Sequence, residues 1–142
     1  MTNPRDSATG LLHGLVSRGV VRLVDDSRRL QELQVETGAG DVEDRVERFG
    51  QYGLTSAPRP GAEALVVHVG ASPDHPVALA VEDRSQRPTG LSPGEVMLYN
   101  DRGARVHLKD DGAIELTAGS SSIRIEDGRI TFIAAAIDFE EA

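Results

Sequence analysis

The C-terminal part of the sequence repeats a short pattern, in which an apolar residue, any residue and a second apolar residue are followed by a turn. Apolar residues two positions apart point to the same face of a β-strand, and the residue between them points to the other face. Successive copies are roughly seven to nine residues apart, which is typical of short strands joined by tight turns. The apolar pairs are Val106 and Leu108, Ile114 and Leu116, Ile123 and Ile125, Ile130 and Phe132, and Ile137 and Phe139.

The pattern predicts a narrow sheet with one apolar face and one polar face. The residues within the pairs are His107, Glu115, Arg124, Thr131 and Asp138, and all of them are polar. A narrow meander is not stable alone, and an uncovered apolar face needs a partner. Copies of the same chain are the simplest partner, so we expect the paired side chains to form the core of a homotrimer around a common axis.

The N-terminal half predicts about five short strands. Residues 19–25 and 30–36 indicate a hairpin, with turn residues at Asp25-Asp26-Ser27. Residues 64–69 and 77–81 are continuous apolar runs, which favour strands buried on both faces. Residues 41–53 fit either a helix or a strand followed by a curved loop. Short antiparallel strands of this number suit a small closed barrel of the OB type, because closure removes exposed edges.

These patterns divide the chain into four segments. Residues 1–18 form a polar lead-in with a weak helical patch at Leu11, Leu12, Leu15 and Val16. The barrel domain is expected at 19–83, a polar connector at 84–94 and the repeated strands at 95–142. The fold class is therefore all-β.

Composition narrows the class of protein. The chain has 142 residues, of which 39 % are hydrophobic and only 4 % aromatic, so its core is aliphatic and thin. The formal net charge of −8 disfavours nucleic acid and anionic lipid as partners. The absence of cysteine excludes disulfides and thiolate sites. No secretory signal or membrane span is recognisable, so we expect the chain to be made and folded in a cytoplasm.

The sequence offers only weak candidates for catalytic or metal-binding residues. The histidines, His13, His68, His75 and His107, lack the spacing of metal ligands. We interpret His107 as a surface residue, His68 as a partly buried structural residue and His75 as a turn residue. The carboxylate pairs at residues 25–26, 82–83 and 110–111 are typical of turns. No nucleophile elbow or phosphate loop is present. We expect no enzyme activity, no metal and no cofactor.

Two further features leave alternatives open. An OB-type barrel can bind nucleic acid, but stacking aromatics are few in this half, with only Phe49 and Tyr52, and the charge is unfavourable. Arg84 and Arg87 lie at the junction between barrel and repeat. They are either exposed linker residues or partners of acidic residues in a neighbouring chain.

Long and idiosyncratic phrases in the sequence resemble one known family. They are VERFGQYGLTSAPRPGAEA, EDRSQRPTGL and GEVMLYNDRGARVHL, within segments 41–70 and 75–108. The resemblance is to the baseplate assembly protein V family of contractile-tailed phages, and within it to the bacteriophage Mu type of central spike protein. It covers about residues 15–125 of the chain.

The resemblance implies a homotrimer with an N-terminal OB-fold collar and a C-terminal triple-stranded β-helix. Such a spike lies in the virion tail baseplate of a phage or related contractile injection device, and it is assembled in the cytoplasm of the host bacterium. It closes the tail tube and is driven mechanically through the host outer membrane. The implied partners are two further copies, tail-hub or baseplate proteins at the collar, and transiently the outer membrane.

The sequence departs from this family at its end. Some members hold an iron ion with a His-x-His pair at the tip, and this chain has no such pair. Either a separate tip protein binds the C-terminal end, or the chain is a shortened version of the spike. The alternative function is a small oligomeric β-protein that binds a carbohydrate or peptide through its barrel. A lytic enzyme is a third hypothesis.

Overall fold

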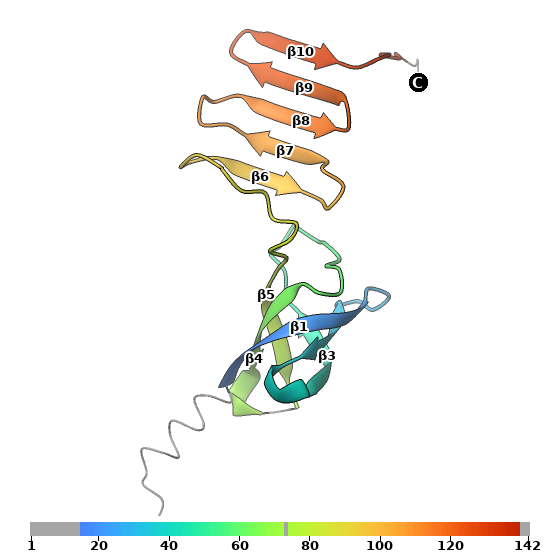
Figure 1. Cartoon of the computed structure of the whole chain (residues 1–142), viewed down its shortest axis with the longest axis vertical. Helices are drawn as coiled ribbons and strands as arrows, with labels where there is room; N and C mark the ends of the chain where they lie inside the picture. Colours follow the sequence, from blue (N-terminus) through green and yellow to red (C-terminus); the bar gives the residue numbers. More distant parts are fainter. Residues whose placement is uncertain (1–14, 73, 140–142) are drawn as a thin grey trace, which may run out of the picture. The chain divides into compact units, whose positions relative to one another are not determined.

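The computed structural model describes residues 15–72 and 74–139, and it divides the chain into two compact units. The first unit ends at Ser85 and the second begins at Gln86. Both are built from β-strands (Figure 1), and the short 3-10 turns η1 (Gly38–Gly40) and η2 (Val69–Ala71) lie in the first unit. The expected helical patch around Leu11 and Leu12 lies outside the described residues.

The first unit is a closed barrel of five strands. They are β1 (Val16–Asp25), β2 (Glu32–Glu36), β3 (Val42–Arg48), β4 (Glu63–His68) and β5 (Pro76–Glu82). The strand order around the barrel is β1-β2-β3-β5-β4, and β4 pairs with β1 to close it. Neighbouring strands are antiparallel except β3 and β5, which are parallel. The sequence β4-β1-β2-β3 is a Greek key, and the prediction of a small closed barrel is confirmed.

The barrel has a small aliphatic core. Side chains from all five strands meet inside it, and the largest fully buried ones are Leu33, Val21, Val35, Val46 and Val66. Segment 41–53, which fits either a helix or a strand in the sequence, is a strand followed by a loop. The buried side chain of Val46 places this strand, β3, in the barrel wall. The core therefore lies entirely within the first unit.

The prediction that both apolar runs are buried on two faces is wrong. In β4, Ala64 and Val66 face the core while Leu65 is 42 % exposed. The pairing of β4 with β5 shifts register between Leu65 and Val66, which leaves Leu79 as an extra residue that is 55 % exposed. A small barrel has an outer wall, so a strand in it buries one face even when both faces are apolar.

Gly19 allows β1 and β2 to approach closely. A Cβ atom at this position would lie 2.5 Å from Cγ1 of Val35 and 2.6 Å from the carbonyl oxygen of Glu36. Real Cβ atoms do not approach other atoms so closely. The glycine is therefore required by packing of the barrel wall.

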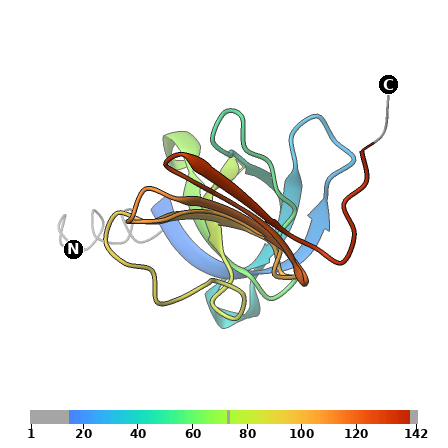
Figure 2. The ribbon, with the colours of Figure 1, turned by 90° about the horizontal axis from the view of Figure 1, so that it is seen from above.

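The second unit is a single antiparallel meander, drawn in yellow to red in Figure 1. Its strands are β6 (Val96–Tyr99), β7 (Arg105–Leu108), β8 (Ile114–Ala118), β9 (Ser121–Glu126) and β10 (Arg129–Ile133), and each pairs with the next. In Figure 2 these strands largely project onto one another, as expected for a sheet that is one layer thick. Glycines with positive φ occupy the turns, such as Gly112 (φ 83°) and Gly128 (φ 70°).

The five strands of the sheet do not coincide with the five apolar pairs of the repeat. Val96–Tyr99 forms the first of the five strands, whereas residues 134–139 form no strand. The prediction of a strand at Ile137 and Phe139 is therefore wrong for the single chain. Among the described residues of this unit Ala113 is the only buried hydrophobic residue, so the sheet has no hydrophobic core of its own.

Candidate functional site: the two faces of the C-terminal sheet

The strand register aligns the apolar side chains of the second unit in two rows on one face. Each strand contributes one residue to each row, because the two residues lie two positions apart. One row is Val96, Leu108, Ile114, Ile125 and Ile130, and the other is Leu98, Val106, Leu116, Ile123 and Phe132. We call these ten side chains the apolar face.

The apolar face is open to solvent in the single chain. Val106 and Ile123 are half-buried, and the other eight side chains range from 37 % exposed at Ile114 to 58 % at Ile130. Monomeric proteins seldom expose a contiguous apolar patch of this kind, and such patches mark interaction sites. The face can bury apolar surface against a partner, but it presents no chemical group for catalysis.

Eight of the ten predicted trimer-core residues lie on this face. The remaining two, Ile137 and Phe139, follow β10 and are 51 % and 92 % exposed. Val96 and Leu98 were missed as members of the rows. These two residues are also two positions apart, as in the other pairs. Because Met97 between them is apolar too, the segment looks like a continuous apolar run rather than an alternating one.

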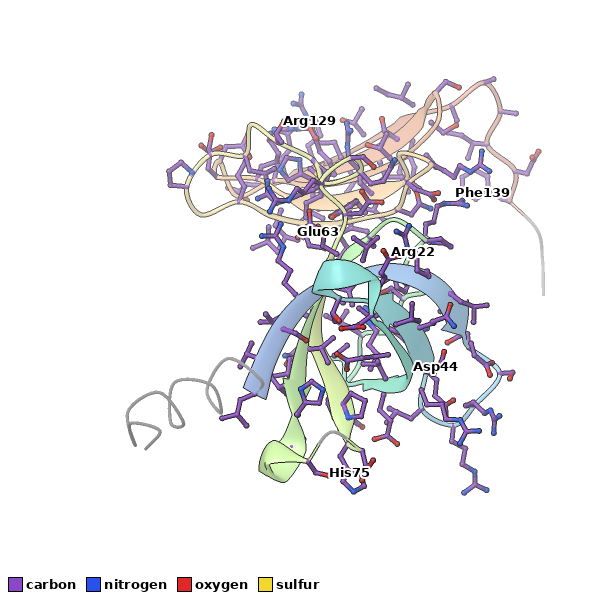
Figure 3. All side chains as sticks on the ribbon, turned by 60° about the horizontal axis from the view of Figure 1, so that its bottom comes forward. Arg22, Asp44, Glu63, His75, Arg129 and Phe139 are labelled. Atoms are coloured by element: carbon purple, nitrogen blue, oxygen red, sulfur yellow. The ribbon has the colours of Figure 1, made fainter. Side chains whose placement is uncertain are left out.

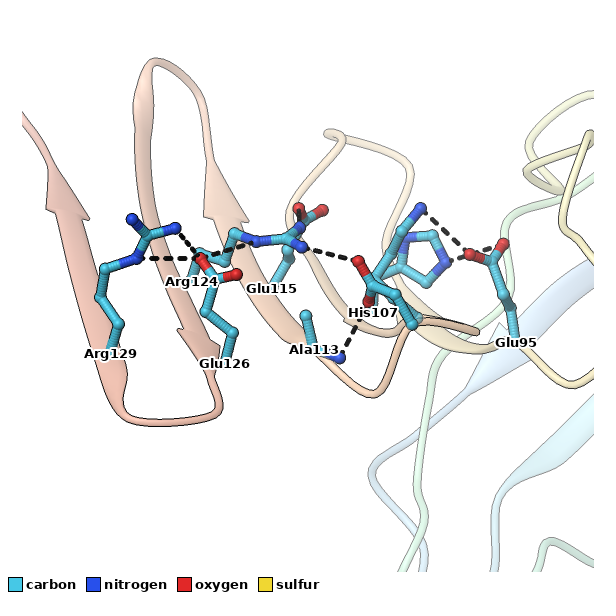
Figure 4. Close-up of polar contacts among 9 residues, drawn as sticks. Glu95, His107, Ala113, Glu115, Arg124, Glu126 and Arg129 are labelled. Carbon is cyan, nitrogen blue, oxygen red and sulfur yellow. Dashed lines mark hydrogen bonds and ion pairs between the residues drawn. The ribbon is translucent and has the colours of Figure 1, made fainter.

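The opposite face carries a row of polar contacts centred on Arg124 (Figure 4). Its guanidinium bonds Glu115 at 2.5 Å and Asp111 at 2.8 Å, and it lies 3.5 Å from Glu126. Glu126 also accepts a bond of 2.7 Å from Arg129. We call this group the Arg124 cluster. It joins β8, β9 and the start of β10 on the face that remains polar.

Hydrogen bonds in the Arg124 cluster favour the charged forms of Asp111 and Arg124. The pKa of Asp111 is lowered first by the backbone N–H of Ala113 and then by Arg124. Hydrogen bonds to Asp111 and Glu115 raise the pKa of Arg124. Asp111 and Arg124 therefore stay ionised near neutral pH, which suits a solvent-facing surface.

Glu95 forms a second cluster at the start of the sheet. Its side chain is 4 % exposed, and one oxygen accepts the backbone N–H of Ser92 at 3.0 Å. That same oxygen lies 3.3 Å from Nε2 of His107, and the other oxygen lies 3.0 Å from Nζ of Lys109. The bond from Ser92, followed by the bond from Lys109, lowers the pKa of Glu95 to about 2.

The prediction that His107 is a surface residue is wrong. The side chain projects from the polar face as its register requires, but it is only 7 % exposed. The cause is the neighbouring Glu95, which lies beside the ring and is itself almost completely covered. His107 is thus a structural side chain that contacts a carboxylate.

The other histidines and carboxylates have local structural contacts. Nε2 of His68 lies 3.1 Å from Glu43 between two barrel strands, as a partly buried structural residue would. Asp25 accepts bonds from the backbone N–H and hydroxyl of Ser27, which is the turn role predicted for residues 25–26. Among residues 15–72 and 74–139, no group of three or more His, Cys, Asp or Glu side chains is placed to hold a metal.

The two junction arginines make contacts within their own chain. Arg84 bonds Glu63 at 2.6 Å, and Glu63 also pairs with Arg18. Burial opposes ionisation of Glu63, but the arginines outweigh this effect and lower its pKa. Arg87 donates to the carbonyl oxygen of Pro88 at 3.3 Å. A pairing of Arg84 or Arg87 with a neighbouring chain stays a prediction.

The barrel unit matches a known protein family. Residues 18–85 match the family model described as "Bacteriophage Mu Gp45, N-terminal". The barrel unit is therefore similar to that family, and the resemblance to Mu-type baseplate proteins is confirmed.

Two relatives extend the similarity into the second unit. The chain is 40 % identical over 124 residues to "Baseplate puncturing device gp45" of Escherichia phage Mu, over 83 % of this chain and 63 % of the relative. It is 41 % identical over 112 residues to "Mu-like prophage FluMu protein gp45" of Haemophilus influenzae, over 79 % of this chain and 61 % of the relative. The chain thus covers less than two thirds of the length of either relative. The phage Mu relative's name describes a baseplate part, which agrees with the prediction that the chain is not an enzyme.

No helix in the described part of the chain has the length and apolarity to cross a membrane.

Proposed function

We propose that the chain is a structural component of a phage-type tail baseplate and acts as a homotrimeric central spike. The observation that carries the proposal is the apolar face, in which two aligned rows of side chains stand open to solvent in one chain. Support also comes from the phage Mu relative, which is named a baseplate puncturing device.

Burial of the apolar face is the driving force for assembly. A fully buried Ile or Leu side chain contributes roughly 1.5–3 kcal/mol. Three copies bring thirty such side chains together, each already partly covered, so the gross gain is on the order of tens of kcal/mol before entropy is subtracted. The polar faces remain outside, where the Arg124 cluster is solvated.

The second part of the proposal is that strands of different copies pair with one another. β6 and β10 are the edge strands of the single sheet, and an unpaired edge offers backbone N–H and C=O groups to another chain. Three narrow sheets wrapped around an axis form the triple-stranded β-helix that the resemblance implies. A dry column of side chains enclosed by such strands is stiff because protein interiors are close-packed.

The proposed role is mechanical. The spike closes the tail tube and is pushed through the host outer membrane, with the barrel as a collar that binds tail-hub proteins. A separate tip protein at the C-terminal end belongs to the same proposal. No step in this role requires a catalytic residue or a cofactor.

The mass of the purified chain in solution tests the proposal. Light scattering after size exclusion is expected to give three times the chain mass of 15.2 kDa. A stable monomer would contradict the spike. A monomer that also titrates with a carbohydrate or peptide would favour the alternative of a barrel that binds a ligand.

A further inference from the structure

The loop between β3 and β4 exposes three large apolar side chains. Phe49 is 53 % exposed, Leu54 is 56 % exposed and Tyr52 is fully exposed. We call these three side chains the apolar loop. Single exposed apolar residues are common on protein surfaces, but three within six positions of one loop form a local patch.

The backbone of the apolar loop is held in place. Arg48 donates to the carbonyl oxygen and to the hydroxyl of Ser56, the latter at 2.9 Å, and Gln31 donates to the same carbonyl at 3.1 Å. A turn closes with a bond of 3.0 Å from the Leu54 N–H to the Gln51 carbonyl, and Gly53 supplies its positive φ of 85°. The apolar side chains are therefore presented by an ordered loop, which lowers the entropy cost of binding.

The charge of the loop favours a second copy of this chain as its partner. Residues 49–58 contain no charged side chain, although 27 % of the whole sequence is charged and the net charge is −8. Copies with this net charge repel one another, so an uncharged patch is where they can touch at the lowest electrostatic cost.

The loop ends where the chain leaves the barrel. It leads into Glu63, which pairs with Glu82 at the carboxyl end of β5 and is bonded by Arg84 in the departing segment. Figure 3 shows Glu63 and His75 at opposite ends of the barrel. Copies that are joined through their second units are thus tethered at the barrel end that carries the apolar loop.

The small size of the patch also favours a tethered partner. A stable interface between free proteins buries about 800 Å² on each side, from roughly 20–30 residues, which three side chains do not supply. Tethering raises the effective concentration of a neighbour to about the millimolar range, so a weak contact suffices.

We propose that the apolar loop packs against the barrel of a neighbouring copy in the oligomer. The inference rests on the self-association under the proposed function and adds a second contact, made by the barrel rather than the sheet. It assigns to Phe49, Tyr52 and Leu54 the task of fixing the barrels to one another.

Thiol reactivity tests this contact, because the natural chain contains no cysteine. Tyr52→Cys places one thiol in the apolar loop, and His75→Cys places one at the opposite, exposed end of the barrel as a matched control. In the assembled full chain, the thiol at position 52 should react with a disulfide reagent at least about tenfold more slowly than that at position 75. Leu54→Cys provides an independent second position.

The same measurement in an Ile123→Asp background separates the two proposals. If the oligomer dissociates, the thiol at position 52 should become as reactive as that at position 75. Equal reactivity in an intact oligomer would overturn the packing of the apolar loop and leave the sheet-driven assembly standing. A monomeric wild-type chain would overturn both.

Discussion

At the scale of single residues, Glu95 organises the start of the C-terminal sheet. It is almost fully covered, and its oxygens contact the backbone of Ser92, Lys109 in the turn after β7, and His107 within β7. A carboxylate in this position replaces its lost hydration by hydrogen bonds to donors. Glu95 therefore connects the segment before β6 with the strand that pairs with β6.

Because of Glu95, the stability of the sheet should depend on pH in the acidic range. Its pKa is lowered from 4.5 to about 2, so its stabilising effect is complete above the ordinary pKa and is lost as the pH falls through about 2. We expect the difference in melting temperature between the wild type and Glu95→Gln to shrink as the pH is lowered from 5 to 2.5. Thermal unfolding followed by circular dichroism measures it, and a difference that is independent of pH would contradict this role.

The close packing around Gly19 predicts that a larger residue there destabilises the barrel. Gly19→Ala adds a Cβ 2.5 Å from Val35, and crowding of a packed wall costs typically about 1–3 kcal/mol. Urea unfolding should show a loss of stability of this size. Gly38→Ala is the matched control, because a Cβ there meets nothing within 4 Å and should change stability little.

At the scale of elements, the sheet of the second unit separates two kinds of surface on alternate residues. Ile123 lies on the apolar face, while Ser122, its neighbour in β9, lies on the polar face. An added charge therefore has opposite consequences at adjacent positions. This contrast gives the clearest test of the register.

Ile123→Asp should split the oligomer, because one carboxylate from each copy would enter a dry column without partners. Ser122→Asp introduces the same charge on the solvent side and should leave the oligomer intact. The molar mass of each variant from light scattering distinguishes the two cases. An unchanged mass for Ile123→Asp would count against burial of the apolar face.

The repeat allowed strands β7 to β10 to be predicted from sequence, because apolar alternation and Gly-containing turns agree there. The membership of β6 in the apolar rows was missed, and the last predicted strand does not form. Met97 hides the alternation in β6, and the apolar pair Ile137 and Phe139 has the right spacing but forms no strand. Periodicity reports which side chains share a face, but backbone pairing also needs a neighbouring strand in register.

Tertiary contacts explain the remaining differences between the predicted and the observed burial of side chains. Leu65 and Leu79 belong to apolar runs, yet both are exposed: Leu65 lies between the core-facing Ala64 and Val66, and Leu79 is the extra residue at the register shift between β4 and β5. His107 is polar and mid-strand, yet Glu95 covers it, and that contact joins residues twelve positions apart in the sequence. Patterns within one strand do not contain such information, so burial of these residues was not predictable.

At the scale of the whole molecule, the two units differ in how they achieve stability. The barrel has its own core, which comprises Val21, Leu33, Val35, Val46 and Val66 among others. The second unit buries only one hydrophobic residue, Ala113, among its described residues. We therefore expect the first unit to fold by itself and the second to depend on association.

Truncation after residue 93 should therefore leave a soluble, folded barrel that associates only weakly, because the apolar face is removed and the apolar loop is no longer tethered. Circular dichroism should retain the β signal, and sedimentation should give a mass near that of a single copy. A truncated chain that remains a robust oligomer would show that the barrel, and not the sheet, is the main source of assembly.

The meander of the second unit is also modular in length. Every strand adds one side chain to each apolar row, so a hairpin inserted at a turn such as residues 119–120 would extend both rows by two positions without disturbing their alignment. Each added strand lengthens the ladder by about 4.8 Å, the distance between hydrogen-bonded strands. Sheets of different lengths can therefore arise from one sequence pattern when whole hairpins are gained or lost. An odd number of residues added within a strand would instead turn the later apolar side chains to the polar face.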